Sequence, residues 1–341
     1  MINEEAKLNP KLFDKDVLKK PIRDGYGEGL VLAGEENENV VVLTADLTES
    51  TRVLDFARKF PERFIQVGVA EQNLATVAAG LGTAGKIPFI SSYAVFSPGR
   101  NWEQIRTTIA YNDSNVKIAG HHAGIITGPD GATHQATEDI AMMRALPNMQ
   151  VWCPCDAIEA KKAVLAAARV WGPVYLRFSR PPTPVITTEE TPYLPAKAEI
   201  FWQSKKPDVL IIACGHLVYQ ALLAAKELER EGIGVIVLNN HTLKPIDHKT
   251  IALLAGKCQA VVTVEDHQII GGLAGAVAEV LANYAPTPVE FIGLQNVFAE
   301  SGDPDDLIEK YGLGVQSIAS AAKKAITRKK QKGVRKSFLD S

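Results

Sequence analysis

The chain has 341 residues, a length that corresponds to two ordinary domains of about 100–200 residues each. Hydrophobic residues make up 46% of the chain and charged residues 22%, which indicates a folded globular protein and excludes a disordered or collagen-like chain. The 37 lysines and arginines are balanced by 39 aspartates and glutamates, and the net charge of −2 leaves no basic excess for a nucleic-acid backbone.

The first half of the chain alternates short apolar strands with helical patterns. Runs of β-branched and aromatic residues predict strands at 40–44, 64–69, 86–90, 116–119, 149–152 and 174–178. Apolar periodicity predicts helices near 22–35, 71–85, 101–112, 138–146 and 156–170. Because strands that alternate with helices form a parallel sheet covered on both faces, we predict a first α/β domain over residues 15–185.

The second half returns to this pattern after a stretch rich in proline and threonine, which predicts a linker at 186–204. Strands are predicted at 209–213, 235–239, 260–265 and 289–292, and helices near 217–231, 247–256, 271–283 and 315–327. These elements predict a second domain over 205–328, followed by a solvated basic tail at 329–341. The predicted fold class is therefore α/β, with two domains that each contain a mainly parallel sheet with helices on both faces.

Three features bear on the location of the protein. No run approaches the roughly 18 apolar residues of a membrane helix, and the N-terminal residues are acidic where a secretory signal is basic. The spacing of the four cysteines is not that of a metal site, and we predict reduced, packed side chains at Cys153, Cys155, Cys214 and Cys258. We expect a cytoplasmic protein that binds neither membranes nor nucleic acid and holds no metal ion of its own.

Polar side chains follow several predicted strands of the first domain, at the edge where open parallel sheets bind ligands. They are Asp46, Ser50, Glu71, His122, Asp130, His134 and Arg180. Taken singly, they have ordinary structural explanations: Glu71 suits the positive end of a helix, and Asp46 and Ser50 suit a turn or an N-cap. Because all of them are expected at the same edge of the sheet, they together predict a polar site that could bind a polyol or a phosphate.

Two segments of the second half are open to more than one interpretation. Gly271–Gly275 opens a predicted helix after a strand, a pattern that suits an anion cradle and tight helix–strand packing equally. The acidic segment Gly302–Asp306 predicts the start of a helix rather than a cation site.

Two motifs resemble those of the thiamine-diphosphate enzymes of the transketolase family. They are Val-Ala-Glu-Gln-Asn at 69–73 and Gly-Pro-Asp-Gly-Ala-Thr-His-Gln at 128–135. The resemblance covers nearly the whole chain but only the C-terminal part of a full-length transketolase, namely its pyrimidine-binding domain (15–185) and its C-terminal domain (205–328). The Gly-Asp-Gly motif of the family's diphosphate domain does not occur in this sequence. The resemblance therefore implies one subunit of a split transketolase, whose partner is an N-terminal subunit that carries Gly-Asp-Gly.

The resemblance implies thiamine diphosphate as the cofactor, with a divalent cation, Mg or Ca, held by the partner subunit. It implies that Glu71 hydrogen-bonds the ring nitrogen of the aminopyrimidine and favours the imino tautomer, whose exocyclic nitrogen removes the thiazolium C2 proton. This role requires a dry, apolar setting, with which the neighbours Val69, Ala70 and Leu74 are consistent.

Other cofactor contacts follow from the same resemblance. Tyr93 and Phe96 lie where the family places aromatic rings beside the aminopyrimidine, and Gly99 takes the place of a third aromatic residue. Asp46 matches an aspartate near the cofactor and the subunit contact.

The resemblance also assigns the substrate side. It implies that four residues bind the phosphate end of the sugar: Arg23, Ser50, His122 and Arg180. Two guanidinium groups with a hydroxyl and an imidazole suit a dianionic phosphate. It further implies that Asp130 reads a substrate hydroxyl and that His134, the second catalytic residue beside Glu71, contacts the reacting oxygens.

The implied activity is transfer of a two-carbon ketol unit from a ketose phosphate to an aldose phosphate in the pentose phosphate pathway, by a heterotetramer. Three alternatives stay open: a 1-deoxyxylulose-5-phosphate synthase, the β subunit of a 2-oxo acid dehydrogenase, and a non-catalytic regulatory subunit. His122 and the segment Phe178-Ser179-Arg180 favour transketolase over the first two alternatives. An intact Glu71 argues against the third, because a binding subunit does not need a proton-transfer carboxylate.

Overall fold

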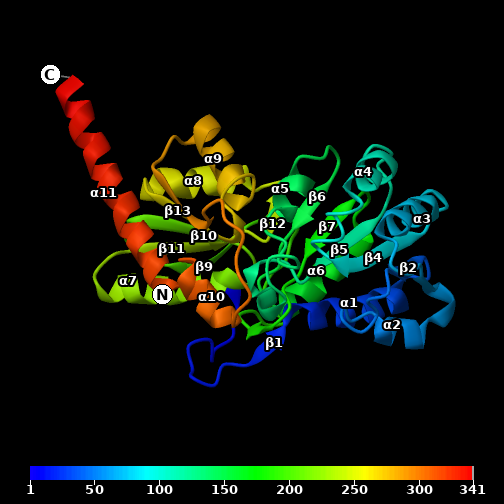
Figure 1. Cartoon of the computed structure of the whole chain (residues 1–341). Coiled ribbons are helices and arrows are strands. Elements are labelled where there is room, and N and C mark those ends of the chain that lie inside the picture. The colour runs from blue at the N-terminus through cyan, green and yellow to red at the C-terminus, as the bar shows by residue number, and fades with distance from the viewer. Residues whose placement is uncertain (340–341) are drawn as a thin grey trace.

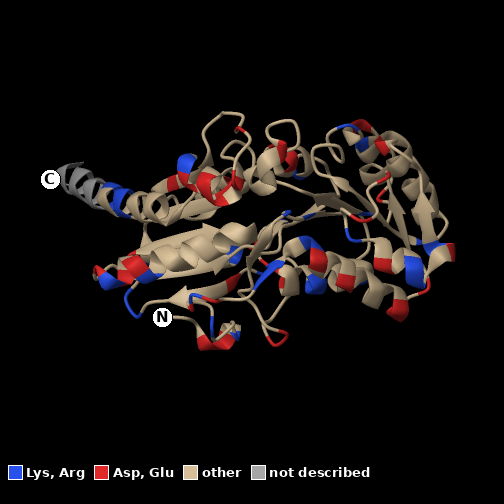
Figure 2. Ribbon diagram, turned by 60° about the horizontal axis from the view of Figure 1, so that its bottom comes forward, with Lys and Arg blue, Asp and Glu red and all other residues tan. Residues whose placement is uncertain are grey.

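The computed structural model describes residues 1–339, and side chains up to residue 329. The chain is built around two mainly parallel sheets, each covered by helices on both faces, so the predicted α/β class is confirmed (Figure 1). Charged residues of both signs alternate along the outer helices, while the strands carry few of them (Figure 2).

The larger sheet has seven strands in the order β12-β6-β7-β5-β4-β2-β3. Its parallel strands are β2 (Val40–Thr44), β3 (Phe64–Gln66), β4 (Ile87–Tyr93), β5 (Lys117–His121), β6 (Gln150–Trp152) and β7 (Val174–Arg177). Strands β2, β5 and β7 are buried along their whole length, and for β2 this explains the near-continuous apolar run in the sequence. The seventh strand, β12 (Thr242–Lys244), comes from the second half of the chain and pairs antiparallel with β6.

Two sets of helices cover this sheet. One face packs against α1 (Ile22–Glu36), α2 (Leu54–Lys59) and α6 (Ala157–Arg169). The other packs against α3 (Glu71–Thr83), α5 (Asp139–Arg144) and the segment predicted as one helix at 101–112, which is α4 (Trp102–Gln104) continued by a π-helical turn (Ile105–Ala110). Helices α1 and α6 cross so closely that a Cβ atom at Gly25 would lie 1.8 Å from the carbonyl oxygen of Ala157.

The smaller sheet has five strands in the order β14-β13-β10-β11-β9. The parallel strands are β10 (Val209–Ala213), β11 (Val235–Asn239), β13 (Val261–Gln268) and β14 (Val289–Leu294), and β9 (Glu199–Gln203) is an antiparallel edge strand. Strand β9 lies within the predicted linker, so that prediction is wrong for these five residues. The neighbouring prolines determined the prediction, whereas burial of Phe201 and Trp202 against the second core determines the structure.

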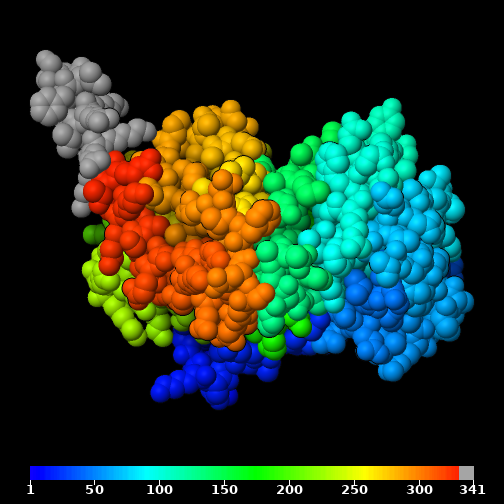
Figure 3. All heavy atoms as spheres, in the orientation of Figure 1, coloured from blue at the N-terminus to red at the C-terminus, as the bar shows by residue number. Residues whose placement is uncertain are grey.

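The helices of the second half also form two layers. One face of the small sheet packs against α7 (Val218–Arg230), α10 (Pro304–Lys310) and α11 (Val315–Leu339), and the other against α8 (His248–Cys258) and α9 (Leu273–Tyr284). The face with α8 and α9 shares one continuous apolar cluster with the α3 and α5 face of the large sheet. Consequently the orange residues of the second domain lie directly against the green part of the first domain in the space-filling view (Figure 3).

Three smaller findings complete the fold. A two-stranded antiparallel ribbon joins β1 (Lys19–Pro21) to β8 (Pro182–Pro184), and neither strand was predicted. Helix α11 continues through most of the predicted basic tail, whose side chains beyond residue 329 and whose residues 340–341 lie outside the described part of the structure. Within the described residues, no helix is long and apolar enough to cross a bilayer.

Candidate functional site

An arginine–histidine pair forms the floor of the site at the carboxyl edge of the large sheet. Arg23 lies in the first turn of α1 and His122 follows β5. Arg23 Nη1 donates to His122 Nε2 at 2.7 Å and to the carbonyl oxygen of Ser50 at 2.9 Å. Burial, together with the charges of Arg23 and Arg180, lowers the pKa of His122 to about 3. The imidazole is therefore neutral at pH 7 and accepts a hydrogen bond at Nε2, so its proton lies on Nδ1.

Two donors of this pair have no hydrogen-bond partner in the part of the chain that the structure describes: Arg23 Nε and His122 Nδ1, both of which are buried. Unpaired buried donors are uncommon, because each costs about 1–3 kcal/mol. Ser50 joins the pair through its backbone carbonyl, whereas its hydroxyl group was the predicted ligand.

A second cation lies across the same loop. Arg180 follows β7, and its Nη1 donates to the carbonyl oxygen of Thr127 at 3.0 Å and to Asp130 Oδ1 at 3.2 Å. Thr127 in turn donates its hydroxyl to the carbonyl oxygen of His122 at 2.5 Å. The loop that carries His122 and Asp130 is thus tied to the end of β7, and two guanidinium groups face one small region.

An aromatic wall extends from this region of two guanidinium groups. Tyr93, at the end of β4, stacks on the ring of His122 with centroids 4.0 Å apart, and Phe96 lies 5.8 Å further along in a stacked arrangement. His134 contacts both rings edge-on, at 5.5 Å from Phe96 and 6.4 Å from Tyr93. Thr133 Oγ1 lies 2.9 Å from His134 Nδ1 and orients that imidazole.

Glu71 lies at the far end of the wall, as the first residue of α3. Its side chain is only 4% exposed, and both carboxylate oxygens accept from Arg100 Nη1 at 3.1 Å. The guanidinium carbon of Arg100 also lies 4.0 Å from the centroid of the Phe96 ring. Asn101 Nδ2 donates to the carbonyl oxygen of Glu71 at 2.9 Å and fixes the start of the helix.

The predicted apolar setting of Glu71 is therefore correct only in part. Leu74 is fully buried, but Val69 is 70% exposed and a guanidinium contacts the carboxylate. The contacts of Arg100 and Asn101 were not predicted. The sequence nevertheless contained an indication of Arg100. A buried carboxylate needs a cation or hydrogen-bond donors nearby, and Arg100 is the first cation after Phe96 in the sequence.

One predicted cofactor contact, Asp46, is not brought into this cluster. Asp46 is exposed at φ +63°, and its only hydrogen bond within the described chain is from its N–H to Gln66 Oε1. Gly99 leaves no space for the third aromatic ring, since a Cβ atom there would lie 1.9 Å from the carbonyl oxygen of Val95.

The C-terminal domain holds the loop 122–135, which carries three of the predicted substrate-binding residues. Asp266 Oδ1, on β13, accepts from the N–H of Ile125 at 2.9 Å, and Gln135 Nε2 donates to the carbonyl oxygen of Glu300 at 3.1 Å. Gly124, at φ +84°, permits this approach, because a Cβ atom would lie 1.9 Å from Asp266 Oδ2. Sequence reasoning did not predict Asp266, since the contact spans 141 residues.

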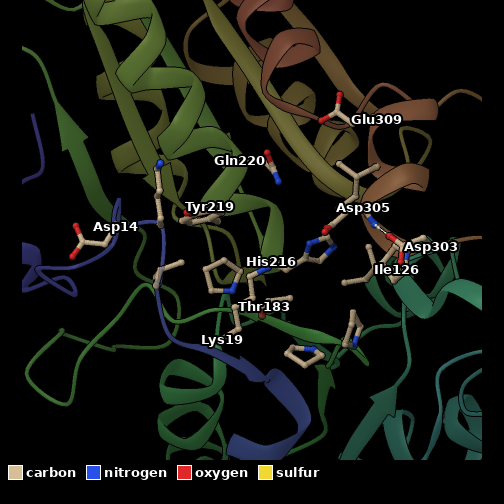
Figure 4. A pocket seen from close by; sticks show the side chains of 17 residues that line it. Asp14, Lys19, Ile126, Thr183, His216, Tyr219, Gln220, Asp303, Asp305 and Glu309 are labelled. Carbon is tan, nitrogen blue, oxygen red and sulfur yellow. Dashed lines mark hydrogen bonds between the residues drawn. The ribbon is translucent and has the colours of Figure 1, made fainter.

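A cavity of about 510 Å³ lies behind this loop, between the two domains (Figure 4). Ile126 and Thr183 line it from the first domain, and His216 and Tyr219 line it from the second. His216 Nε2 lies 3.0 Å from Asp266 Oδ2, so one hydrogen-bonded pair both lines the cavity and supports the loop 122–135.

The structure decides between the two interpretations of Gly271–Gly275. The carboxylate of Glu265 accepts from the N–H groups of Leu273 and Ala274 at 2.6 and 2.7 Å. The place that an external anion would take at the start of α9 is therefore occupied by a side chain of the protein. A Cβ atom at Gly272 would lie 2.0 Å from Glu265 Oε2, which makes tight packing the reason for this glycine. Asp303 caps α10, as predicted, and no cluster of three or more metal-ligating side chains occurs among the described residues.

Comparison with known proteins adds the family context. Residues 19–185 match the transketolase pyrimidine-binding domain, and residues 197–318 match the transketolase C-terminal domain. A transketolase C-terminal section from Methanocaldococcus jannaschii is 47% identical over 88% of this chain and 94% of its own length. A 6-deoxy-6-sulfo-D-fructose transketolase subunit from a Clostridium species is 40% identical over 90% of this chain and 95% of its own length.

Among solved structures, a split-gene transketolase described as an inactive β4 tetramer is 48% identical, with a TM-score of 0.84. The match covers 90% of this chain and 98% of the solved chain.

Proposed function

The chain belongs to the transketolase family, as its C-terminal subunit, and we propose that it takes part in thiamine-diphosphate-dependent transfer of a two-carbon ketol unit between sugars. One observation carries this proposal: a buried carboxylate, an aromatic wall and a two-guanidinium region lie in line at one sheet edge. The wall runs from Phe96 beside the Glu71–Arg100 pair, through Tyr93, to the His122–Arg23 pair.

The residues present fit a flat, nitrogen-containing ring at the Glu71 end. A carboxylate with 4% exposure already binds a planar, delocalised cation, whose carbon lies over the ring of Phe96. When bound, thiamine diphosphate supplies a thiazolium that stabilises negative charge on the transferred carbon. We propose that Glu71 holds the proton at the pyrimidine ring nitrogen, and that Phe96 and Tyr93 pack against the ring and exclude water.

At the other end, Arg23 and Arg180 supply two fixed positive charges, while His122 is neutral and has an unpaired N–H at Nδ1. Because Arg23 Nε and His122 Nδ1 lack partners among the described residues, the site suits an anion that completes their hydrogen bonds. A terminal phosphate or sulfonate has this chemistry, and the Clostridium relative is named for a sulfo-sugar. The proposed substrates are thus sugars with an anionic end, a broader class than pentose phosphates.

Between the two ends, we propose that His134 contacts the reacting oxygens and that Asp130 accepts a hydrogen bond from a substrate hydroxyl. His134 contacts Phe96 edge-on, next to the proposed ring site, and Asp130 pairs with Arg180 beside the anion region. Binding of the anionic end fixes the distance of the sugar carbonyl from the ring site. Binding energy at the far end of the sugar thus orients the reacting carbonyl.

The diphosphate half of the site is proposed to come from a partner. The described residues of this chain contain no metal-ligating cluster, and Gly-Asp-Gly is absent from the sequence. We infer an N-terminal transketolase subunit that carries Gly-Asp-Gly and holds Mg or Ca with the diphosphate, in a heterotetramer. The description of the related β4 tetramer as inactive supports the inference that this chain is inactive alone.

The proposal is tested by assaying the chain alone, the N-terminal subunit alone and the two together, each with thiamine diphosphate and a divalent cation. We expect ketol transfer from a ketose phosphate only in the mixture. Turnover by this chain alone would refute the proposed division of the site. Decarboxylation of pyruvate by the mixture without ketol transfer would instead support a synthase or a dehydrogenase subunit.

A further inference from the structure

Arg100 contacts both groups that the proposed ring site would offer to a cofactor. Its Nη1 donates to both oxygens of Glu71 at 3.1 Å, and its guanidinium carbon lies 4.0 Å from the centroid of Phe96. A pocket lined by residues 69–73 and by Arg100 opens beside this contact. One side chain thus uses the carboxylate and the ring face at the same time.

A guanidinium and a protonated aminopyrimidine share the properties that allow a group to contact both the Glu71 carboxylate and the Phe96 ring. Both are flat, both spread a positive charge over carbon and nitrogen, and both donate N–H groups in the plane. A carboxylate whose two oxygens accept from a guanidinium does not offer the same lone pairs to a ring nitrogen. Arg100 and the pyrimidine therefore compete for one place.

We propose that Arg100 is the chain's own occupant of the pyrimidine place, and that cofactor binding displaces it. This inference rests on the proposed function, because it assumes that Glu71 and Phe96 hold the pyrimidine. Arg100 would then lower the affinity for the cofactor, and it would stabilise the buried charge of Glu71 until the cofactor arrives.

The two members of the pair differ in how easily they move. Glu71 is 4% exposed at the start of a helix, and a buried carboxylate without a counter-ion strongly destabilises the folded state. Arg100 is half exposed, and Glu71 and Phe96 are its only side-chain partners within the described residues. When the pair separates, the arginine can turn into solvent and regain its hydration, so it is the member that leaves.

The experiment compares Arg100→Met with the wild type. Methionine keeps an unbranched apolar chain over Phe96 but removes the charge and the N–H donors. Arg106→Met is the matched control, because Arg106 is exposed in the following π-helical turn and has no side-chain partner among the described residues. Each variant is reconstituted with the N-terminal subunit, and thiamine diphosphate binding is measured by calorimetry at fixed divalent cation concentration.

We expect Arg100→Met to bind the cofactor roughly 2- to 5-fold more tightly than the wild type, the effect of removing a half-exposed ion pair that competes with the ligand. Arg106→Met should bind as the wild type does. Equal or weaker binding by Arg100→Met would overturn the inference, since Arg100 would then be a bystander or a permanent partner of Glu71. If neither the wild type nor Arg100→Met binds, the proposed function fails and the inference fails with it.

A second measurement needs no cofactor. Urea unfolding of the full chain is measured for the wild type, Arg100→Met, Glu71→Gln and the double variant. If Arg100 compensates the buried charge, Arg100→Met destabilises the chain when Glu71 is present and has little effect when glutamine replaces it. Additive effects would overturn the pairing on which the inference stands, whether or not the cofactor binds.

Discussion

The guanidinium of Arg177 donates to both carboxylate oxygens of Asp139, at 2.8 and 3.2 Å, and neither side chain is more than 5% exposed. The same guanidinium donates to the carbonyl oxygen of Asp266 at 2.8 Å, and the hydroxyl of Tyr175 donates to Asp139 at 2.7 Å. One buried ion pair therefore joins β7, α5 and β13. Because the side chain of Asp266 also accepts from the N–H of Ile125, this junction supports the loop 122–135.

Removing Arg177 should destabilise the whole fold. Arg177→Met leaves Asp139 buried and without its counter-ion, a change that costs about 3–5 kcal/mol. The free energy of unfolding in urea measures this loss. Arg169→Met is the control: it removes an exposed pair with Glu36 and should change stability by less than about 1 kcal/mol. Similar losses in both variants would contradict the role given to the junction.

Glu71→Gln should slow cofactor activation far more than it weakens the fold. The amide keeps the size of the side chain but does not hold a proton for the ring nitrogen, and proton transfer of this kind contributes roughly 10²–10⁴-fold. The measurement is hydrogen–deuterium exchange at C2 of the bound cofactor by NMR, in the reconstituted complex. Exchange within a few-fold of the wild-type rate would show that Glu71 does not have the proposed role.

Arg180→Ala should discriminate between acceptors with and without an anionic end. Loss of a charged hydrogen bond of about 1.5–3 kcal/mol lowers kcat/KM for a phosphorylated or sulfonated acceptor by roughly 10- to 150-fold. For glycolaldehyde, which has no anionic end, the change should be small. The donor is loaded onto the enzyme beforehand, so that its own phosphate does not enter the comparison. Equal losses for both acceptors would mean that Arg180 supports the loop through Thr127 and Asp130 instead of binding the anion.

The neutral state of His122 predicts a pH dependence of stability. Its pKa is about 3 in the folded chain, against about 6.5 in the unfolded chain. Between these values the unfolded chain binds more protons, so this residue makes stability rise with pH across that window and fall on acidification. We therefore expect His122→Asn to reduce the slope of the unfolding free energy between pH 4 and 6.5, as measured in urea at several pH values. An unchanged slope would show that His122 is not held neutral by its surroundings.

The sequence by itself determined the α/β class and the position of the main strands. Strands such as Val40–Thr44 and Val209–Ala213 are buried along their whole length, and burial of both faces requires an apolar run that is visible locally. The motifs at 69–73 and 128–135 likewise identified the family from short, contiguous residues. Strand β9 was missed because its five residues lie in a region whose prolines indicate a linker.

Only the tertiary structure decided how the candidate residues meet. Arg100 reaches Glu71 across 29 residues, Arg23 reaches His122 across 99, and Asp266 reaches Ile125 across 141. Strand β12 joins the larger sheet although it follows three strands of the smaller one. Periodicity and capping rules describe neighbours within about one turn or one strand, whereas these contacts depend on which elements pack together in three dimensions. A buried carboxylate indicates that it needs a partner, but packing alone selects which of many arginines supplies it.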